Sequence, residues 1–245
     1  MRSVICSFVL FYSLTCTAQS RSTTVELSDI SAPKQQFIAF KGKMTFSEHV
    51  TNGRTFQKQD AVASGEILSA RPIVAFVAIF EWYGFGGGRS ASSARHDQFF
   101  SSHDFVTGDT VDFIVPQGNV MSTDSSSSAA GGSEYTVDLK FVQFADGSIW
   151  RDKSIGDELA AQRADMIAYM EHLLSEYGAG NEQSFVTAMN LPPVPREHQK
   201  LTTAFALQKR LQMVHSKSGT ATAIELIKQQ LNFAATRMST GNFQQ

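Results

Sequence analysis

The chain has 245 residues, 42% of them hydrophobic and 18% charged, and a formal net charge of −2. This length and apolar content are enough to bury a core in one domain or in two small ones. The near-neutral charge, without a cluster of lysine and arginine, argues against a nucleic-acid-binding protein, which needs a basic surface to displace counterions from phosphates.

The first eighteen residues have the layout of a secretory signal peptide. Arg2 gives a positive start, an apolar stretch follows, and small residues precede a cleavage site after Ala18. The stretch is shorter than the run of about 20 residues that a membrane-spanning helix needs. We therefore expect a signal peptide at 1–18 and a periplasmic or secreted mature protein. Lipid attachment at Cys16 is the alternative.

Both cysteines of the chain, Cys6 and Cys16, lie in this segment. Cleavage would remove them, which excludes disulfides, zinc-thiolate sites and cysteine nucleophiles from the mature chain. Packing alone would then stabilise the exported protein.

Residues 19–150 predict a β domain, because they are rich in Phe, Val, Ile and Thr and are divided by turn signals. Segments 24–30 and 37–46 are typical of opening strands. Segment 73–83, "IVAFVAIFEWY", has almost no polar break, so we interpret it as a central strand buried on both faces. A buried helix is the alternative there.

Further strands are expected at 111–115 and 135–141. One face of the latter carries, at period two, Tyr135, Val137, Leu139 and Phe141. Asp146-Gly147 favours a hairpin turn, after which Trp150 would fold back against Phe144 or Val142. Many short strands with turns between them indicate an antiparallel sandwich or barrel. The serine-rich segment 122–134 is expected to be a loop between strands, with a domain linker as the alternative.

Residues 151–245 predict about three helices, because the hydrophobic period changes after Trp150. The first helix is expected from Ser154 to about Gly178. Its apolar stripe consists of Leu159, Met166, Met170, Leu173 and Tyr177. A proline-rich break at 190–198 precedes a second helix at 196–216, which should end at Gly219. Its inward residues would be Leu201, Phe205 and Leu211.

A third helix is expected at 220–238. Its apolar residues recur at steps of three and four: Ile224, Ile227, Leu231, Ala234 and Met238. This resembles a coiled-coil seam but lasts only two heptads, which favours an intramolecular packing face. Self-association through this helix is the alternative.

The glycine- and serine-rich stretch 84–93 fails two motif tests. A phosphate-binding loop needs a lysine where Arg89 stands, and a nucleophile elbow needs a glycine where Ser92 stands. Trp82, Tyr83 and Phe85 could line a ligand-binding loop, although aromatic residues at a strand end more often cap a core. If a ligand site exists, we expect it at the strand-end loop 84–96.

Segment 94–105, "ARHDQFFSSHDF", contains the candidate metal ligands His96, Asp97, His103 and Asp104. A metal would need these groups to converge within about 2.2 Å of one ion. On a strand His96 and His103 would point to opposite faces. We therefore expect no metal and no catalytic residues, with the polar pairs bonding to backbone at strand ends.

The stretches "SGEILSARPIVAFVAIFEWYG" and "RHDQFFSSHDFVTGDTVDFIV" resemble a pattern in uncharacterised exported bacterial proteins with an immunoglobulin-like β-sandwich. The matching positions are Gly65, Ile67, Arg71, Ile73, Thr107, Gly108 and Asp109. "FVQFADGSIWRD" looks like the closing hairpin of such proteins. The resemblance covers residues 36–150 and implies a fold but no catalytic residues.

These expectations combine into an α+β protein with three parts: a signal peptide at 1–18, an immunoglobulin-like antiparallel β-sandwich at 19–150 and a helical C-terminal region at 151–245. The expected role is a non-catalytic binding or assembly module of the periplasm or cell envelope, without a cofactor. Its partner would be a protein or an envelope component. The alternatives are a metal-dependent hydrolase using 94–105 and an envelope protein that oligomerises through 220–238.

Overall fold

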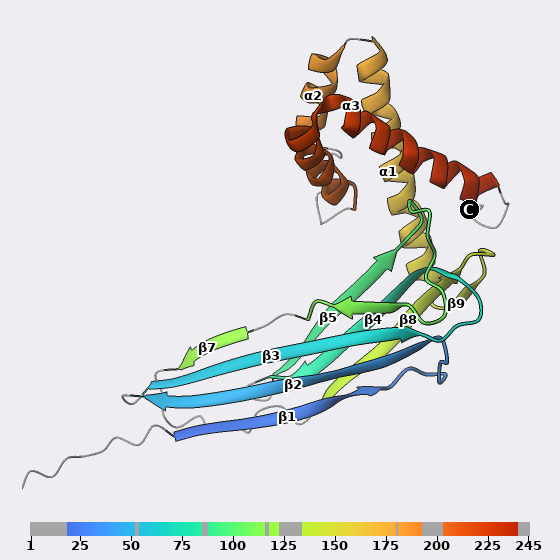
Figure 1. The fold of residues 1–245 in the computed structure, drawn as a ribbon. Coiled ribbons are helices and arrows are strands. Elements are labelled where there is room, and N and C mark those ends of the chain that lie inside the picture. Colours follow the sequence, from blue (N-terminus) through green and yellow to red (C-terminus); the bar gives the residue numbers. More distant parts are fainter. Residues whose placement is uncertain are drawn as a thin grey trace, which may run out of the picture.

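The structure is a computed structural model that describes residues 19–51, 54–84, 88–115, 118–122, 134–179, 181–192 and 203–239. The expected signal peptide and nearly all of segment 122–134 lie outside the described residues. Figure 1 shows an elongated β unit with a helical region standing at one end of it.

The described residues form strands first and helices afterwards. The strands are β1 Gln19–Asp29, β2 Ile38–Thr51, β3 Arg54–Ile67, β4 Ile73–Tyr83, β5 Arg89–Asp97, β6 Thr110–Phe113, β7 Gly118–Ser122, β8 Tyr135–Phe144 and β9 Ile149–Arg151. The helices are α1 Lys153–Ala179, α2 Glu182–Asn190 and α3 Thr203–Ser239. The predicted α+β class, with a β unit followed by a helical region, is confirmed.

The strands belong to one sheet whose order is β5-β4-β8-β1-β2-β3-β6, with β7 added to β3 and β9 added to β8. The first part of β1, up to Glu26, pairs antiparallel with β2, and residues 27–29 pair parallel with β8. Side chains of β2 and β3 meet those of β4 and β8 in one core, so the sheet folds over on itself as two layers. The purely antiparallel pairing that we expected is wrong, because β1 crosses between the layers and changes its partner.

Strand β4 is the centre of the β unit and is buried on both faces, as predicted. Phe76 and Phe80 lie in the core between the layers, whereas Ala75 and Val77 face the helical region. The segment extends over eleven residues, so the helix alternative is wrong.

A bulge in β8 moves Phe141 to the other face. Three of the four residues predicted on one face lie in the inner core: Tyr135, Val137 and Leu139. Lys140 is an extra residue between two positions that pair with neighbouring residues of β4. Phe141 therefore packs outward against Leu159 of α1. Helix α1 comes close here, since a Cβ on Gly156 would lie 3.1 Å from the Phe141 ring.

The predicted hairpin after β8 is confirmed. Gly147 has a φ of +80°, and Trp150 pairs with Val142 across the turn. Trp150 also packs edge-on against Phe37, with ring centroids 5.3 Å apart.

The sequence patterns missed three strands: β3, β5 and β7. The inward side of β3 includes the buried polar residues Thr55, Gln57 and Gln59, so its apolar alternation is lost. Strand β5 consists mainly of serine and alanine and occupies most of the expected loop 84–96, which is therefore wrong as a loop. Small polar residues are typical of loops, and only pairing with β4 reveals the strand.

The helical region differs from the prediction in its second half. Helix α2 was missed, although Asn181 caps it by accepting from the amides of Gln183 and Ser184. The helices expected at 196–216 and 220–238 form the two parts of α3, which bends at Gly219, where φ is 81° and ψ is 174°. Phe205 is 38% exposed, so its predicted inward position is wrong, whereas the buried position of Leu211 is confirmed. Leu201 lies outside the described residues.

The apolar stripe of 220–238 packs within the chain. Ile224 and Ile227 join a core formed with α1 and α2, and Ala234 contacts a cluster with Val74 and Phe99. This confirms the predicted intramolecular packing face. Self-association through the same face would have to compete with these contacts.

Candidate functional site

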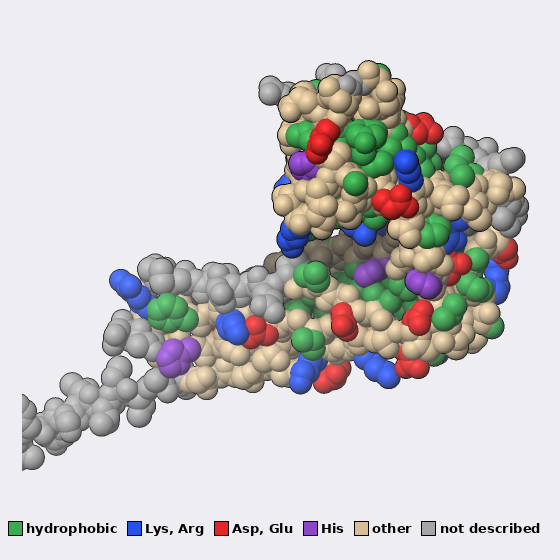
Figure 2. Space-filling model, turned by 45° about the horizontal axis from the view of Figure 1, so that its top comes forward, with side chains coloured by type: hydrophobic (Ala, Val, Ile, Leu, Met, Phe, Trp, Pro, Cys, Tyr) green, Lys and Arg blue, Asp and Glu red, His purple; other side chains and the backbone are tan. Residues whose placement is uncertain are grey.

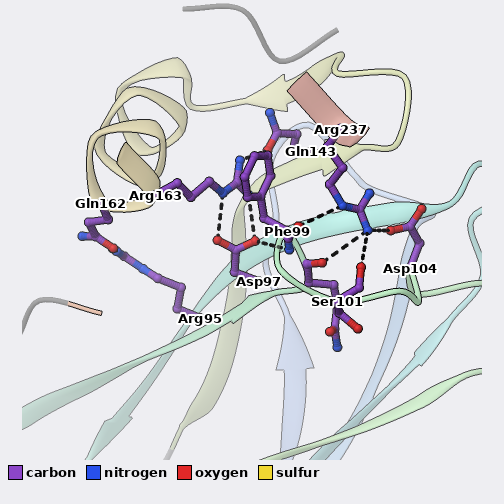
Figure 3. A network of polar contacts seen from close by, with 10 residues as sticks. Arg95, Asp97, Phe99, Ser101, Asp104, Gln143, Gln162, Arg163 and Arg237 are labelled. Atoms are coloured by element: carbon purple, nitrogen blue, oxygen red, sulfur yellow. Dashed lines mark hydrogen bonds and ion pairs between the residues drawn. The ribbon is translucent and has the colours of Figure 1, made fainter. Parts of the chain in front are cut away.

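Segment 94–105, which contains the four candidate ligands, lies where the β unit meets the helical region. It begins in β5, turns at Phe99 and Phe100, and reaches Phe105, which forms a bridge with Ile73 at the start of β4. Figure 3 shows that two arginines, one from α1 and one from the end of α3, point into this turn.

Arg163 of α1 engages Asp97 at the end of β5. Its Nε and Nη2 donate to the two carboxylate oxygens at 2.9 and 2.8 Å, and its Nη1 donates to Oε1 of Gln143 at 2.7 Å. The guanidinium also lies 4.4 Å from the centroid of the Phe99 ring. The Arg163 side chain is only 7% exposed and that of Asp97 20%, so this is a part-buried bidentate ion pair with a nearly buried guanidinium.

Arg237 of α3 engages the other aspartate, Asp104. The guanidinium is ion-paired with that carboxylate and donates to the backbone carbonyls of Phe99, Gln98 and Ser101 at 3.1, 3.3 and 3.2 Å. The turn thus offers several acceptors to one cation, which satisfies backbone groups that would otherwise need water. We call the set Arg163, Asp97, Arg237 and Asp104 the arginine clamp.

The two histidines point elsewhere. His96 stacks on Phe76 with ring centroids 5.0 Å apart and also contacts Phe105 and Phe113, on the inner side of β5. Burial lowers its pKa, since a charged imidazole would lose hydration there. His103 is exposed, and its backbone amide donates to Oγ of Ser101.

The four candidate residues therefore do not converge. Among the residues that the structure describes, no group of three or more potential His, Cys, Asp or Glu ligands could hold a metal ion. The aspartates bond mainly to arginines, and not only to backbone as the sequence suggested, although Asp97 also accepts from the amide of Phe99 at 3.0 Å.

The sequence patterns did not identify the two arginines, yet a signal was present. Arg163 lies four residues after Leu159 and seven before Met170, so it occupies the apolar stripe of its helix. Arg237 similarly follows Ala234 by three residues. A cation in an apolar stripe must find a buried acceptor, and the aspartates of 94–105 were available for it.

A hollow of about 330 Å³ adjoins the arginine clamp. It is lined by Ser101, Ser102, Asp104, Ala145, Phe233, Thr236 and Arg237. Its volume reaches the lower end of the range for small-molecule pockets, about 300 Å³. However, its two charged groups, Asp104 and Arg237, are paired with each other.

The end of β4 offers less space than we expected for a ligand loop. Trp82 is 5% exposed and belongs to the core, Tyr83 is 37% exposed, and Phe85 lies outside the described residues. A hollow of about 70 Å³ beside them is bordered by the ion pair of Arg89 and Glu81. It could hold only a few water molecules, each of which occupies about 30 Å³.

Comparison of the chain with family models, curated proteins and solved structures found no match. Within the described ranges, no helix combines the length and the apolar run needed to cross a membrane.

Proposed function

We propose that the protein is an exported, non-catalytic binding or assembly module of the periplasm or cell envelope. The β unit and the helical region would act as one rigid body whose surface binds a protein or another envelope component.

The observation that carries this proposal is that Asp97 and Asp104 are both paired with arginines. An acid–base or metal-binding role needs a carboxylate that can reach a substrate or an ion. Both oxygens of Asp97 are bonded to a nearly buried guanidinium, and Asp104 is paired with Arg237, whose side chain is 14% exposed. The polar groups that a hydrolase would use are instead occupied in joining the two parts of the molecule.

Export is supported by the layout of residues 1–18: Arg2, an apolar stretch, and small residues before a cleavage site after Ala18. Both cysteines precede the expected cleavage site, so the β core needs no disulfide, and its interior is instead rich in aromatic side chains that pack against one another.

The immunoglobulin-like assignment of the β unit also belongs to the proposal. It is supported by the two facing layers and by a first strand that contributes to both of them. The connectivity departs from the standard order in both layers. β2 and β3 are consecutive neighbours, as are β4 and β5, whereas the corresponding pairs of an immunoglobulin domain, B with E and C with F, are separated in sequence by two strands. The proposal is therefore an immunoglobulin-like layer arrangement with its own connectivity.

Two measurements test export and the absence of a metal site. The intact mass of the protein recovered from the exported fraction should correspond to a chain that begins at Gln19; recovery of the uncleaved chain from the cytoplasm would refute export. Calorimetric titration with zinc, manganese and calcium should show no site tighter than about 100 μM, the tight end of the affinity range of extracellular calcium modules. A tighter site, lost in Asp97→Asn, would favour the hydrolase.

The binding role is tested by cross-linking in intact cells, with an Arg163→Met variant as the comparison. A partner recovered at fixed stoichiometry with the wild-type chain, and reduced with the variant, is the expected result. Equal recovery with both chains would show that binding does not depend on the joined body.

A further inference from the structure

Strand β5 forms one edge of the sheet. It pairs with β4 and with no other strand among the described residues. It has nine residues, whereas the strands at the opposite edge, β6 and β7, have four and five. Short strands are one means by which proteins protect a sheet edge, and β5 lacks that protection.

The hydrogen bonds at both ends of β5 show which backbone groups face outward. The amide of Gly84 donates to the carbonyl of Gly88, and the amide of Gln98 donates to the carbonyl of Val74. Pairing alternates along an antiparallel ladder, so the even-numbered residues of β5 bond to β4 and the odd-numbered ones point away. The outward residues are Arg89, Ala91, Ser93, Arg95 and Asp97, and each of them is exposed.

The edge lacks two of the residues that most often block a sheet edge, and its charged side chains bond within their own chain. Strand β5, "RSASSARHD", contains neither lysine nor proline. Its two arginines are directed toward their own chain: Arg89 pairs with Glu81, and Arg95 bonds to Gln162 at 2.9 Å and to Glu158 at 3.1 Å. The Asp97 side chain is 20% exposed although the residue as a whole is exposed, because its backbone faces solvent.

We propose that this edge binds β5 of a second copy of the chain, in antiparallel orientation around a two-fold axis at Ser93. Outward residues can bond only to outward residues, so one strand can slide along the other only by two residues at a time. Each such slide moves the two-fold axis by one residue. With the axis at Ser93, all five outward residues of each copy are paired. Each Arg89 then lies opposite Asp97 of the second copy, and the small residues Ala91, Ser93 and their neighbours fill the centre.

Charge selects this register over its neighbours. Moving the axis to Ser92 sets Arg89 opposite Arg95, which is a repulsive pair. Moving it to Ala94 leaves Arg89 without an opposite residue in the strand. With the axis at Ser93, the side-chain charges alternate in sign along one row. Glu81 and Arg89 of one copy are followed by Asp97 and Arg163 of the second copy. The edge is therefore self-complementary, which is the property that a two-fold interface requires.

The first test uses the full chain with Cys6→Ser and Cys16→Ser. Ser93 is the only position that meets itself in the proposed register, at a Cα separation of about 5.5 Å, within the range of a disulfide. Ser93→Cys should give a cross-linked dimer under mild oxidation. Ser92→Cys is the matched control, since residue 92 lies opposite Ala94 of the second copy and should not cross-link. Cross-linking of Ser92→Cys instead of Ser93→Cys would overturn the register.

The second test uses sedimentation equilibrium and does not depend on cysteine chemistry. Ser93→Pro removes an outward N–H without removing a bond to β4, and the two-fold axis applies the change twice. The dissociation constant of the dimer should rise at least about tenfold, whereas Ser93→Ala should leave it unchanged. An unchanged melting temperature would show that Ser93→Pro is folded. A wild-type monomer, or a dimer unaffected by Ser93→Pro, would overturn the proposal, whatever the outcome for export.

Discussion

Enlarging Gly156 should separate α1 from the β8 bulge. A Cβ at this position would lie 2.9 Å from Cδ1 of Ile149 and 3.1 Å from the Phe141 ring, where ordinary contacts are about 3.5–4.0 Å. Ile149 is 40% exposed and can move, but the Phe141 ring is fully buried. An added side chain must therefore displace the helix or the ring.

The magnitude follows from two opposing effects. Replacing glycine by alanine in a helix stabilises it by about 1 kcal/mol, whereas overpacking a core costs about 1–3 kcal/mol. Gly156→Ala should therefore give little or no net gain. Gly156→Val adds two more methyl groups and has a weaker helix preference, so we expect a loss of about 2–3 kcal/mol and a melting temperature lower by about 4–12 °C.

Thermal unfolding followed by circular dichroism measures this effect, with Gly178→Ala as the matched control in the same helix. No atom lies within 4 Å of a Cβ at Gly178, so alanine there should stabilise by up to about 1 kcal/mol. If Gly156→Val proved as stable as the wild type, α1 would not be seated on Phe141.

Three further predictions concern single positions. Burial lowers the pKa of His96, so the unfolded chain binds a proton more readily than the folded chain does. The free energy of unfolding should therefore have its full value above about pH 6.5 and decrease below it. His96→Phe keeps the stack on Phe76 and should reduce the fall in urea-unfolding free energy between about pH 7 and pH 5; an equal fall in both chains would contradict this. Gly219 has φ and ψ values that are essentially restricted to glycine, so Gly219→Ala should cost about 1–3 kcal/mol, and no loss in a chemical-denaturation curve would show that the bend in α3 is absent. The Tyr135 hydroxyl is buried with no hydrogen-bond partner among the described residues, so Tyr135→Phe should raise the unfolding free energy by up to about 1–3 kcal/mol, whereas a clear decrease would indicate an unrecognised partner.

The elements that could be predicted are those in which the residue types alone indicate burial or a turn. Strand β4 is apolar throughout because both of its faces are buried, and the turn at Gly147 shows its residue preference directly. The change to helix near residue 151 is visible in the hydrophobic period. These are local signals, and they need no knowledge of distant partners.

The elements that were missed depend on contacts between distant residues. Strand β5 has small polar side chains and becomes a strand only beside β4, and the bulge that turns Phe141 outward arises from the pairing of two strands. The arginine clamp joins residues 66 and 133 positions apart in sequence. The pattern could indicate that Asp97 and Asp104 needed partners, but not that α1 and α3 would supply them.

The coupling between Asp97 and Arg163 tests the central claim most directly. A double-mutant cycle would compare Asp97→Ala, Arg163→Met and the two changes together by chemical denaturation. Removing Asp97 leaves the nearly buried Arg163 charge uncompensated, which costs up to about 3–5 kcal/mol, whereas the carboxylate left by Arg163→Met is partly solvated and should cost less; the coupling should be at least about 2 kcal/mol. A coupling below about 0.5 kcal/mol, as in exposed pairs, would show that the aspartate does not join the β unit to the helices.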